Sequence, residues 1–347
     1  MDTSQVEKVV EQVEGGCHLS MSEMRDTIDA VMEGRFGDDH IARFLLGLNR
    51  KGPTVAEVAG AAAAMRKHVT PIRSRRIGVL DTCGTGGDGS KTFNISTAAA
   101  LVVGAAGVPV AKHGNRGVTS RSGSADVLAA LGVNIEASRA CVEACLDELG
   151  ICFCFAPLLH PAMKRVAAVR RQLAVPTVFN ILGPLANPAG ATYQLIGVGR
   201  AALRPLLAEA LAMLGADRAA VVHGQDGMDE VSLSGPTDVT LVADGQLTEL
   251  SWTPEQFGLP HGRREDLVVE GPEQSAATIL AILKGQRGPA PDIVVANAAA
   301  ALWTVGRVAS LPAGVNAAAE AIDSGSAALL LQRLVDSTHR VNREAVP

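Results

Sequence analysis

What the chain lacks excludes several classes of protein. No apolar run approaches the roughly 18 residues that a membrane-spanning helix needs, and the polar N-terminus carries acidic residues unlike those of a secretion signal. The formal net charge is −5, so the chain has no excess of basic residues with which to bind nucleic acid or an anionic membrane. We therefore expect a soluble cytoplasmic protein that acts on small molecules.

The six cysteines contain no C-x-x-C pair, which is the spacing most typical of zinc and redox sites. Cys141 and Cys145 are one helical turn apart, and Cys152 and Cys154 alternate along a predicted strand. The pattern favours buried free thiols over a zinc site, and it predicts that the isolated Cys17 is reduced.

A glycine-rich run at 84–89, GTGGDG, resembles the phosphate-binding turn of dinucleotide-binding proteins. That interpretation requires an acidic residue about 20 positions later to bind the ribose, yet no Asp or Glu lies between Gly89 and Ala125. A P-loop is also excluded, because Ser90 stands where its last glycine should precede Lys91-Thr92.

The residues after the glycine run indicate a phosphorylated sugar instead. Glycines allow consecutive N–H groups to point at phosphate, and Lys112 and Arg116 follow within the segment that has no acids. Asn94, Ser96 and Thr97 would begin the next helix, whose N-terminus favours a second phosphate. A glycine-rich turn that only packs a helix on a sheet is the structural alternative.

The order of predicted elements indicates an α/β protein with a small N-terminal helical domain. Capping boxes at Ser20-x-x-Glu23 and Thr54-x-x-Glu57 predict helices in the first 70 residues. Strand-like runs at 77–80, 108–111, 151–155, 219–223 and 238–242 then alternate with helix-like runs at 96–106 and 124–131. This alternation predicts a central, mostly parallel sheet flanked by helices, with the ligand at the carboxyl ends of its strands.

The remaining polar motifs each have a functional and a structural interpretation. Asp229-Glu230 follows a predicted strand, so it is either a Mg²⁺ site or an exposed acidic turn. The arginines between Pro71 and Arg76 indicate a solvated hinge more than a binding patch. Ser120, Ser122 and Ser124 are candidate caps for the helix that follows them.

Eight sequence blocks occur in the order found in one enzyme family. They are GTGGDG (84–89), FNIST (93–97), KHGNR (112–116), SGSADVL (122–128), HPAMK (160–164), VRRQL (169–173), FNILGPLANP (179–188) and MDEVSLSGPT (228–237). Together they resemble the anthranilate phosphoribosyltransferase family, from about Val6 to about Gln332. The resemblance implies a helical domain at 1–72, rejoined by a segment near 165–185, and an α/β phosphoribosyl-binding domain at 76–340. It also implies a homodimer formed through the helical domain.

The resemblance implies three groups of site residues and no catalytic nucleophile. The phosphoribosyl pyrophosphate group is Gly84, Gly87, Asp88, Thr92, Asn94, Ser96, Thr97, Lys112, Gly114, Asn115, Arg116, Gly117, Ser120 and Ser124. The anthranilate group is Gly84, His113, Asn115, Arg170, Gly183 and Pro184, with Arg171 as the rival of Arg170 for the substrate carboxylate. The Mg²⁺ ligands implied are Ser96, Asp229 and Glu230.

The implied reaction is transfer of phosphoribose from 5-phosphoribosyl 1-pyrophosphate to the amine of anthranilate, with Mg²⁺ as cofactor. Two alternatives stay open, a pyrimidine nucleoside phosphorylase-like enzyme and a nucleic-acid-binding paralogue without activity. The chain departs from the family pattern at Ala174 and Pro176, where Gly and Arg are common, and at Leu159, where a second His often precedes His160.

Overall fold

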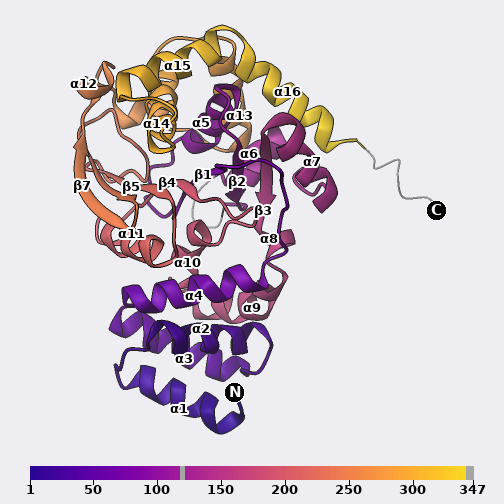
Figure 1. Cartoon of the computed structure of the whole chain (residues 1–347), viewed down its shortest axis with the longest axis vertical. Helices are drawn as coiled ribbons and strands as arrows, with labels where there is room; N and C mark the ends of the chain where they lie inside the picture. Colours follow the sequence, from indigo (N-terminus) through magenta and orange to yellow (C-terminus); the bar gives the residue numbers. More distant parts are fainter. Residues whose placement is uncertain (118–121, 341–347) are drawn as a thin grey trace, which may run out of the picture.

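The computed structural model describes residues 1–117 and 122–340. An N-terminal group of helices forms the narrower part of the molecule, and a larger part built on one sheet lies above it (Figure 1). The N-terminal helices are α1 (Thr3–Glu14), α2 (Met21–Met32), α3 (Asp38–Lys51) and α4 (Val55–His68). None of the helices in the described residues is both long and apolar enough to cross a membrane.

Local sequence signals define the N-terminal helices. Ser20 and Thr54 accept hydrogen bonds from the N–H groups of Glu23 and Glu57, so both predicted capping boxes are confirmed. In α1 the buried residues Val6, Val10 and Val13 recur at intervals of four and three, which places them on the face that packs against α3.

One seven-stranded sheet organises the larger part, in the order β3-β2-β1-β4-β5-β6-β7. Strands β1 to β5 run parallel, whereas β6 and β7 are antiparallel additions at one edge. The prediction of a mostly parallel sheet is therefore confirmed. The strands are β1 (Leu80–Gly84), β2 (Val110–Gly114), β3 (Ile151–Phe155), β4 (Tyr193–Gly197), β5 (Arg218–Gly224), β6 (Thr237–Ala243) and β7 (Gln246–Trp252).

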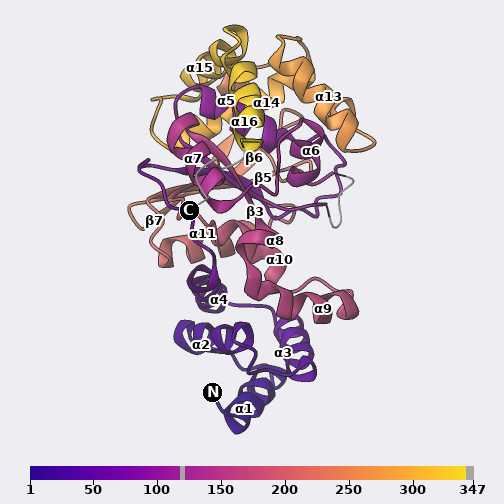
Figure 2. The same cartoon turned by 90° about the vertical axis from the view of Figure 1, so that its right-hand side faces the viewer.

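Helices cover both faces of the sheet (Figures 1 and 2). The long helices of this part are α5 (Ile95–Ala105), α7 (Arg139–Leu149), α9 (Lys164–Leu173), α11 (Leu203–Met213), α13 (Pro272–Leu283), α14 (Pro289–Thr304), α15 (Leu311–Asp323) and α16 (Ser326–Thr338). The short ones are α6 (Ser124–Ala130), α8 (Ala156–Leu159), α10 (Phe179–Leu182), α12 (Pro254–Phe257) and the 3-10 turns η1 (Pro161–Met163), η2 (Gly183–Leu185) and η3 (Arg264–Leu267).

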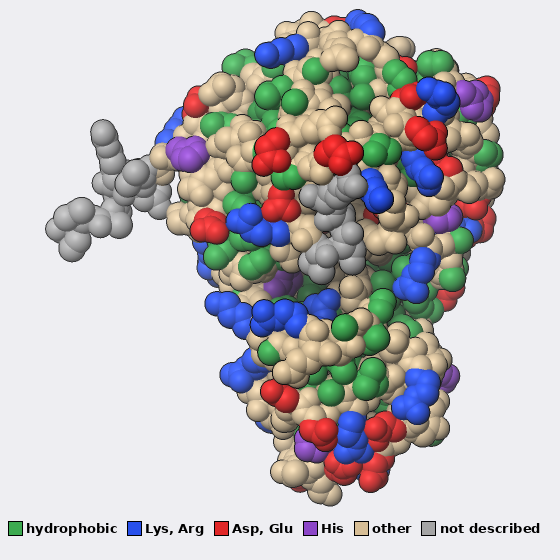
Figure 3. Space-filling model, turned by 180° about the vertical axis from the view of Figure 1, so that it is seen from behind, with side chains coloured by type: hydrophobic (Ala, Val, Ile, Leu, Met, Phe, Trp, Pro, Cys, Tyr) green, Lys and Arg blue, Asp and Glu red, His purple; other side chains and the backbone are tan. Residues whose placement is uncertain are grey.

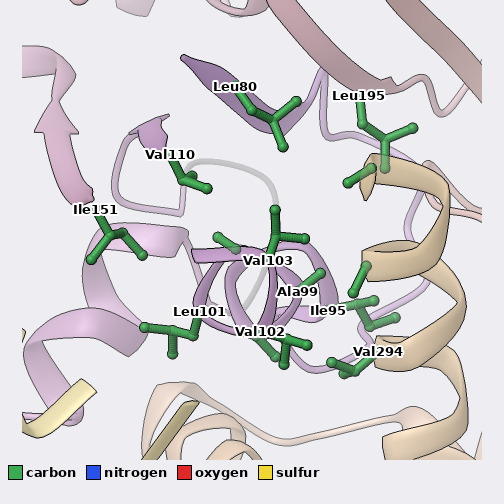
Figure 4. Packing of buried hydrophobic residues seen from close by; sticks show 14 of the residues in the cluster. Leu80, Ile95, Ala99, Leu101, Val102, Val103, Val110, Ile151, Leu195 and Val294 are labelled. Atoms are coloured by element: carbon green, nitrogen blue, oxygen red, sulfur yellow. The ribbon is translucent and has the colours of Figure 1, made fainter. Parts of the chain in front are cut away.

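Two hydrophobic cores lie on opposite faces of the sheet, because neighbouring residues of a strand point to opposite sides. Leu195 of β4 belongs to the core built around α5 and α14, and Ile196 belongs to the core shared with α11 and the N-terminal helices. Figure 4 shows Leu80, Val110 and Leu195 facing α5. The second core joins the N-terminal helices to the sheet.

The boundaries predicted for two strands were wrong. The runs at 77–80 and 108–111 predicted strands that the structure places at 80–84 and 110–114, and Ile77 is 90% exposed. The sequence pattern failed because Asp81, Thr82, Lys112 and His113 are polar and yet buried inside the strands. Strands β4 and β7 were not predicted.

Other local predictions had mixed outcomes. All six cysteines are free thiols; Cys17 is exposed and the other five are buried. The segment 71–76 is solvated apart from Ile72, as predicted, and Arg75 pairs with Asp147. Helix α6 is capped by Gly123 and by Asp126, which accepts the Gly123 N–H, so the prediction of Ser122 or Ser124 as its cap is wrong.

Ala174 adopts a left-handed conformation at the end of α9, with φ 51° and ψ 26°. A side chain with a Cβ destabilises this conformation by about 1–2 kcal/mol, whereas glycine adopts it freely. Ala174→Gly should therefore stabilise the protein by up to about 1 kcal/mol, after allowance for the greater freedom of glycine in the unfolded chain.

The measurement is thermal unfolding, with Ala168→Gly as the matched control on the exposed face of the same helix. Because Ala168 is in the helix interior, its replacement should destabilise the protein by about 1 kcal/mol. A lower unfolding temperature for Ala174→Gly would show that the left-handed conformation is not strained.

Candidate active site

The site lies at the carboxyl ends of the parallel strands, where β1, β2, β4 and β5 bring their following loops together. Gly197 at the end of β4 permits this convergence. A Cβ at this position would lie 1.6 Å from the carbonyl oxygen of Asp229, so no other residue type fits without moving that loop. The loop after β5 is therefore held directly against the sheet.

The glycine loop after β1 contacts the same carboxylate. Gly86, Gly87 and Gly89 have φ of 65°, 79° and 69°, in the left-handed region that glycine alone enters freely. The Gly86 N–H donates to Asp229 Oδ2 at 3.0 Å, and a Cβ on Gly84 would lie 2.7 Å from the same oxygen. The structure thus brings the two predicted motifs, 84–89 and 229–230, into contact.

The carboxylates of Asp88, Asp229 and Glu230 gather at this point, and the pKa values of Asp229 and Glu230 are raised. Burial and the nearby charge of Asp88 raise the pKa of Asp229 to about 7, and burial and Asp229 raise the pKa of Glu230 to about 8. Asp88 Oδ2 is buried and accepts no hydrogen bond from the described residues. The carboxylates of Asp88, Asp229 and Glu230 are therefore not fully balanced by nearby positive charge.

This carboxylate cluster fits a hard divalent cation. Asp229 and Glu230 each accept a backbone N–H, from Gly86 and Ser96, so both carboxylates are fixed in place. Within residues 1–117 and 122–340 no three His, Cys, Asp or Glu side chains form a complete metal site. The arrangement suits Mg²⁺, which commonly takes one or two carboxylates and completes its shell with phosphate oxygens and water.

The N-terminus of α5 is fixed by side-chain hydrogen bonds. Asn94 is the N-cap residue, and its amide oxygen accepts from the Ser122 and Ser275 hydroxyls at 2.7 and 2.9 Å. The Ser96 N–H donates to Glu230 at 3.0 Å, while the Thr97 hydroxyl is buried without a hydrogen-bond partner among the described residues. Thr92 lies just before this helix, with its hydroxyl 3.2 Å from that of Ser90.

Lys112 lies beneath the site, not in the loop above it. Its side chain is in a residue only 3% exposed, and its ammonium donates to Thr82 O at 2.5 Å and to Ser96 Oγ at 3.2 Å. Burial lowers the pKa of Lys112, whereas the surrounding acids, foremost Asp81, oppose that shift. The positive charge of Lys112 is attracted by the carboxylates of Asp81, Glu230 and Asp229.

The loop after β2 is held by an acidic residue of α6. Asp126 accepts the N–H groups of Gly117 and Gly123 and pairs with Arg116 at 3.2 Å. Arg116, which the sequence predicts as a phosphate-binding residue, is thus paired in this structure with Asp126, the residue that holds its loop. Asn115 Oδ1 accepts the Arg116 N–H at 2.8 Å, and the predicted Ser120 lies outside the described residues.

The absence of a side chain at Gly114 and Gly123 lets the loop after β2 lie close to Ser124 and to Gly117. A Cβ on Gly114 would lie 1.9 Å from Ser124 Oγ, and one on Gly123 would lie 2.3 Å from the Gly117 nitrogen. Ser124 Oγ lies 3.5 Å from Asn115 O. Gly114, Asn115, Gly117 and Ser124 are therefore brought together, as the sequence blocks predict.

His113 connects β2 to two segments that join the parts of the molecule. Its Nδ1 lies 3.0 Å from Gly183 O, and its Nε2 lies 3.1 Å from His160 Nε2. Burial is the main cause that lowers the pKa of His113 to about 3 and that of His160 to about 4. Both nitrogens of His113 are engaged, so it is not available as a general base.

Arg170 and Arg171 differ in their surroundings. Arg170 donates to Asn180 Oδ1 at 3.3 Å, and its guanidinium lies 5.6 Å from the ring centroid of Phe179. Arg171 is exposed. The neighbouring Pro184 uses its carbonyl to accept from Gln194 at 2.6 Å. Arg170 thus faces the segment that carries Gly183 and Pro184, and Arg171 does not.

Sequence reasoning missed several residues that support the site. Asp81 is fully buried and accepts from the His113 N–H at 3.1 Å and from Asn187 Nδ2 at 2.8 Å. Ser275 of α13 binds Asn94 from 181 positions away in the sequence. An acid inside an apolar strand was a signal for Asp81, but nothing in the sequence indicated Ser275.

Known proteins resemble this chain over nearly its whole length. Residues 76–328 match the family described as glycosyl transferase family, a/b domain, and residues 7–69 match its helical bundle domain. The anthranilate phosphoribosyltransferase of Rhodopirellula baltica is 51% identical over 322 residues, which cover 93% of this chain and 94% of that protein.

Solved structures of the same enzyme share the fold. That of Thermus thermophilus is 44% identical, with a TM-score of 0.91, over 96% of this chain and 99% of that one. The Saccharomyces cerevisiae enzyme in complex with PRPP and Mg is 27% identical, with a TM-score of 0.88, over 97% and 98%. The yeast enzyme was also solved with 4-fluoroanthranilate, at 26% identity, with a TM-score of 0.86 over 96% and 98%.

The raised carboxylate pKa values predict an unusual dependence of stability on pH. Because Asp229 and Glu230 have folded-state pKa values of about 7 and 8, against 3.8 and 4.5 for ordinary Asp and Glu, the folded protein binds more protons than the unfolded chain between these values. Their contribution is thus present at low pH and lost as pH rises through about 8. Asp229→Asn with Glu230→Gln should remove this loss.

The measurement is the difference in unfolding temperature between the metal-free double variant and the metal-free parent from about pH 5 to about pH 8.5, in which the contribution of the buried histidines cancels because both proteins share it. The double variant should unfold at a higher temperature than the parent at the upper limit, and the gap should narrow steadily towards the lower one. Glu320→Gln, exposed on α15, is the control. A constant gap across this range would contradict the assigned pKa values.

Proposed function

Because the chain belongs to the anthranilate phosphoribosyltransferase family, we propose that it transfers phosphoribose from 5-phosphoribosyl 1-pyrophosphate to anthranilate. The products are N-(5-phosphoribosyl)anthranilate and pyrophosphate, a step of tryptophan biosynthesis. The observation that carries the proposal is the direct contact of the glycine loop with Asp229, which joins a phosphate site to a pair of carboxylates. We place the activity in the cytoplasm.

Asp229, Glu230 and Ser96 would hold Mg²⁺ against the pyrophosphate. The ion would neutralise charge on the leaving group as the bond to the ribose carbon breaks. Asp88, Asn94, Thr92 and the glycines Gly84 and Gly87 would border the same pyrophosphate group. Lys112 supports the arrangement from below, because its buried charge limits the repulsion between the carboxylates.

The loop of Gly114 to Gly117, with Ser124, would bind the phosphoribosyl group. Asp126 sets the loop's shape through its hydrogen bonds to Gly117 and Gly123. Thr97 would contribute its unpartnered hydroxyl or the N-terminus of α5. We propose that catalysis rests on positioning and on stabilisation of charge, because both ring nitrogens of His113 are engaged.

The acceptor would lie between the sheet and the segment 160–184. Arg170 can form two parallel hydrogen bonds with the carboxylate of anthranilate, and His113, Asn115, Gly84, Gly183 and Pro184 would surround the ring. We propose that residues 1–72 with the segment near 165–185, and residues 76–340, are the two domains that enclose it.

Lys and Arg side chains gather at the waist between the two parts, where α9 lies (Figure 3). On α9, Lys164, Arg165 and Arg171 are exposed. A positive rim at this place would attract a polyanionic donor. The overall net charge is nevertheless −5, and no observation favours a nucleic-acid-binding role or the phosphorylase alternative.

The test of the function is loss of anthranilate fluorescence in the presence of phosphoribosyl pyrophosphate and Mg²⁺. The parent protein should consume anthranilate, and the folded Asp229→Asn, Glu230→Gln variant should not. Near-normal turnover by that variant would show that the acidic pair is only a surface turn. Retention on heparin at moderate salt, without turnover by the parent, would favour the paralogue without activity.

Arg170→Ala should raise the Michaelis constant for anthranilate by on the order of tenfold to a hundredfold. Hydrogen bonds to a charged group contribute about 1.5–3 kcal/mol, and the lost partner belongs to the acceptor alone. The constant for phosphoribosyl pyrophosphate should change much less. Steady-state kinetics with each substrate varied in turn measure both.

Arg171→Ala is the matched control, because its side chain is exposed on the same helix. It should leave the anthranilate constant close to that of the parent. The unfolding temperature of each variant separates loss of the hydrogen bond between Arg170 and Asn180 from loss of substrate binding. A larger defect in Arg171→Ala would place the acceptor site elsewhere.

We propose that the protein is a homodimer formed through the helical domain. Leu46 on α3 and Val175 after α9 are 41% and 39% exposed, which supplies apolar surface on that part. Light scattering at micromolar concentration should give twice the mass of one chain, and Leu46→Glu should shift the protein towards the monomer. A monomeric parent would contradict the proposal.

A further inference from the structure

His160 forms one end of a hydrogen-bonded chain whose tautomers are fixed by its other end. Gly183 O can only accept, so His113 Nδ1 must carry a hydrogen. In a neutral ring that leaves His113 Nε2 as an acceptor, and the hydrogen between the two rings must then belong to His160 Nε2. The order of donation is His160 to His113 to Gly183.

Both rings are held neutral by their surroundings. His113 and His160 are 7% and 6% exposed, and their ring centroids lie 5.0 Å apart. The charged neighbours of His113 are Lys112 beside it and Asp81, which accepts the His113 backbone N–H. A proton on His113 would place two N–H groups against each other across 3.1 Å unless His160 moved its own hydrogen to Nδ1, so this order of donation exists only in the neutral state.

The hydrogen bonds from His160 to His113 to Gly183 link the two segments that connect the sheet to α9, one leading to the helix and one leading back. His160 lies between α8 and η1, on the way from β3 to α9, and Gly183 begins η2, on the way back to β4. His113 belongs to β2, so one imidazole ring bridges the outgoing and the returning connection. Helix α9 packs against α3 and α2 and carries Arg170.

We propose that His160 is a positioning residue for the acceptor substrate, which acts by donating to His113 Nε2 and so holding the orientation of that ring. By holding His113 against Gly183, it fixes the distance between the end of β2 and the segment that carries Arg170, Gly183 and Pro184. This inference rests on the proposed function for its substrate but not for its hydrogen bonds.

The first test reads the tautomers directly in the unaltered protein. Nitrogen-15 NMR of histidine-labelled protein distinguishes the two neutral tautomers and the charged ring, and His160→Gln assigns the signals. We expect His113 with hydrogen on Nδ1 and His160 with hydrogen on Nε2, neither of them titrating between about pH 5.5 and 8. A hydrogen on His113 Nε2, or a titration of either ring in this range, overturns the proposal.

The second test is kinetic. His160→Leu removes the donor and should raise the Michaelis constant for anthranilate on the order of three- to tenfold, the effect of one neutral hydrogen bond, with that for phosphoribosyl pyrophosphate within about twofold. His160→Gln places an N–H near the position of Nε2 and should recover most of the loss. His261→Leu, exposed and far along the sequence, is the control.

The outcomes separate the proposal from its alternatives. Equal changes in both Michaelis constants, or no rescue by glutamine, would mean that His160 only stabilises the fold. If His160→Leu does not fold, the NMR result and the glutamine variant decide. If the parent has no transferase activity, the proposed function fails, and the NMR result still decides whether the bonded chain exists.

Discussion

A single buried ammonium group holds the site together. Lys112 donates to Thr82 O and Ser96 Oγ, and the charges of Asp81, Glu230 and Asp229 act on it electrostatically. Removing a charge from water costs several kcal/mol, which nearby opposite charges repay only in part. Burial raises the pKa of Asp81, Asp229 and Glu230, so their ionised forms are disfavoured at this point. A bound cation would favour the ionised forms of these acids, so the site is suited to a cation and to the phosphate groups that accompany it.

The sheet gives the cluster its geometry. Parallel strands deliver their carboxyl ends to one edge, but side chains would normally keep the loops apart. Gly197 removes that obstacle beneath Asp229, and Gly114 does so beneath Ser124. The glycines of this fold therefore serve two purposes, because those at 86, 87 and 89 shape the loop while those at 114 and 197 only make room. A sequence motif does not distinguish these purposes.

Features that depend on residues close together in the sequence were predicted better than features that depend on distant residues. Ser20 and Thr54 were identified as caps from residues three positions away, and the helices they begin are where expected. The strands at 80–84 and 110–114 were displaced because Asp81, Lys112 and His113 look like loop residues until their distant partners are known. Of the site, the sequence blocks predicted which segments meet. They could not predict Asn187, Ser275 or His160, whose roles depend on residues 47 to 181 positions away.

Three crossings of the chain join the sheet to the N-terminal helices, and all three are bonded to one another. Thr70 N donates to Leu159 O at 2.8 Å, and Ile72 N donates to Pro188 O at 2.9 Å. The histidine pair then connects the second and third crossings through the end of β2. If catalysis rests on positioning, an error of about 1 Å between donor and acceptor is costly. Two parts of a molecule can hold donor and acceptor this precisely only if the connections between the parts are fixed at a common point. His113, which is bonded to both His160 and Gly183, is that point.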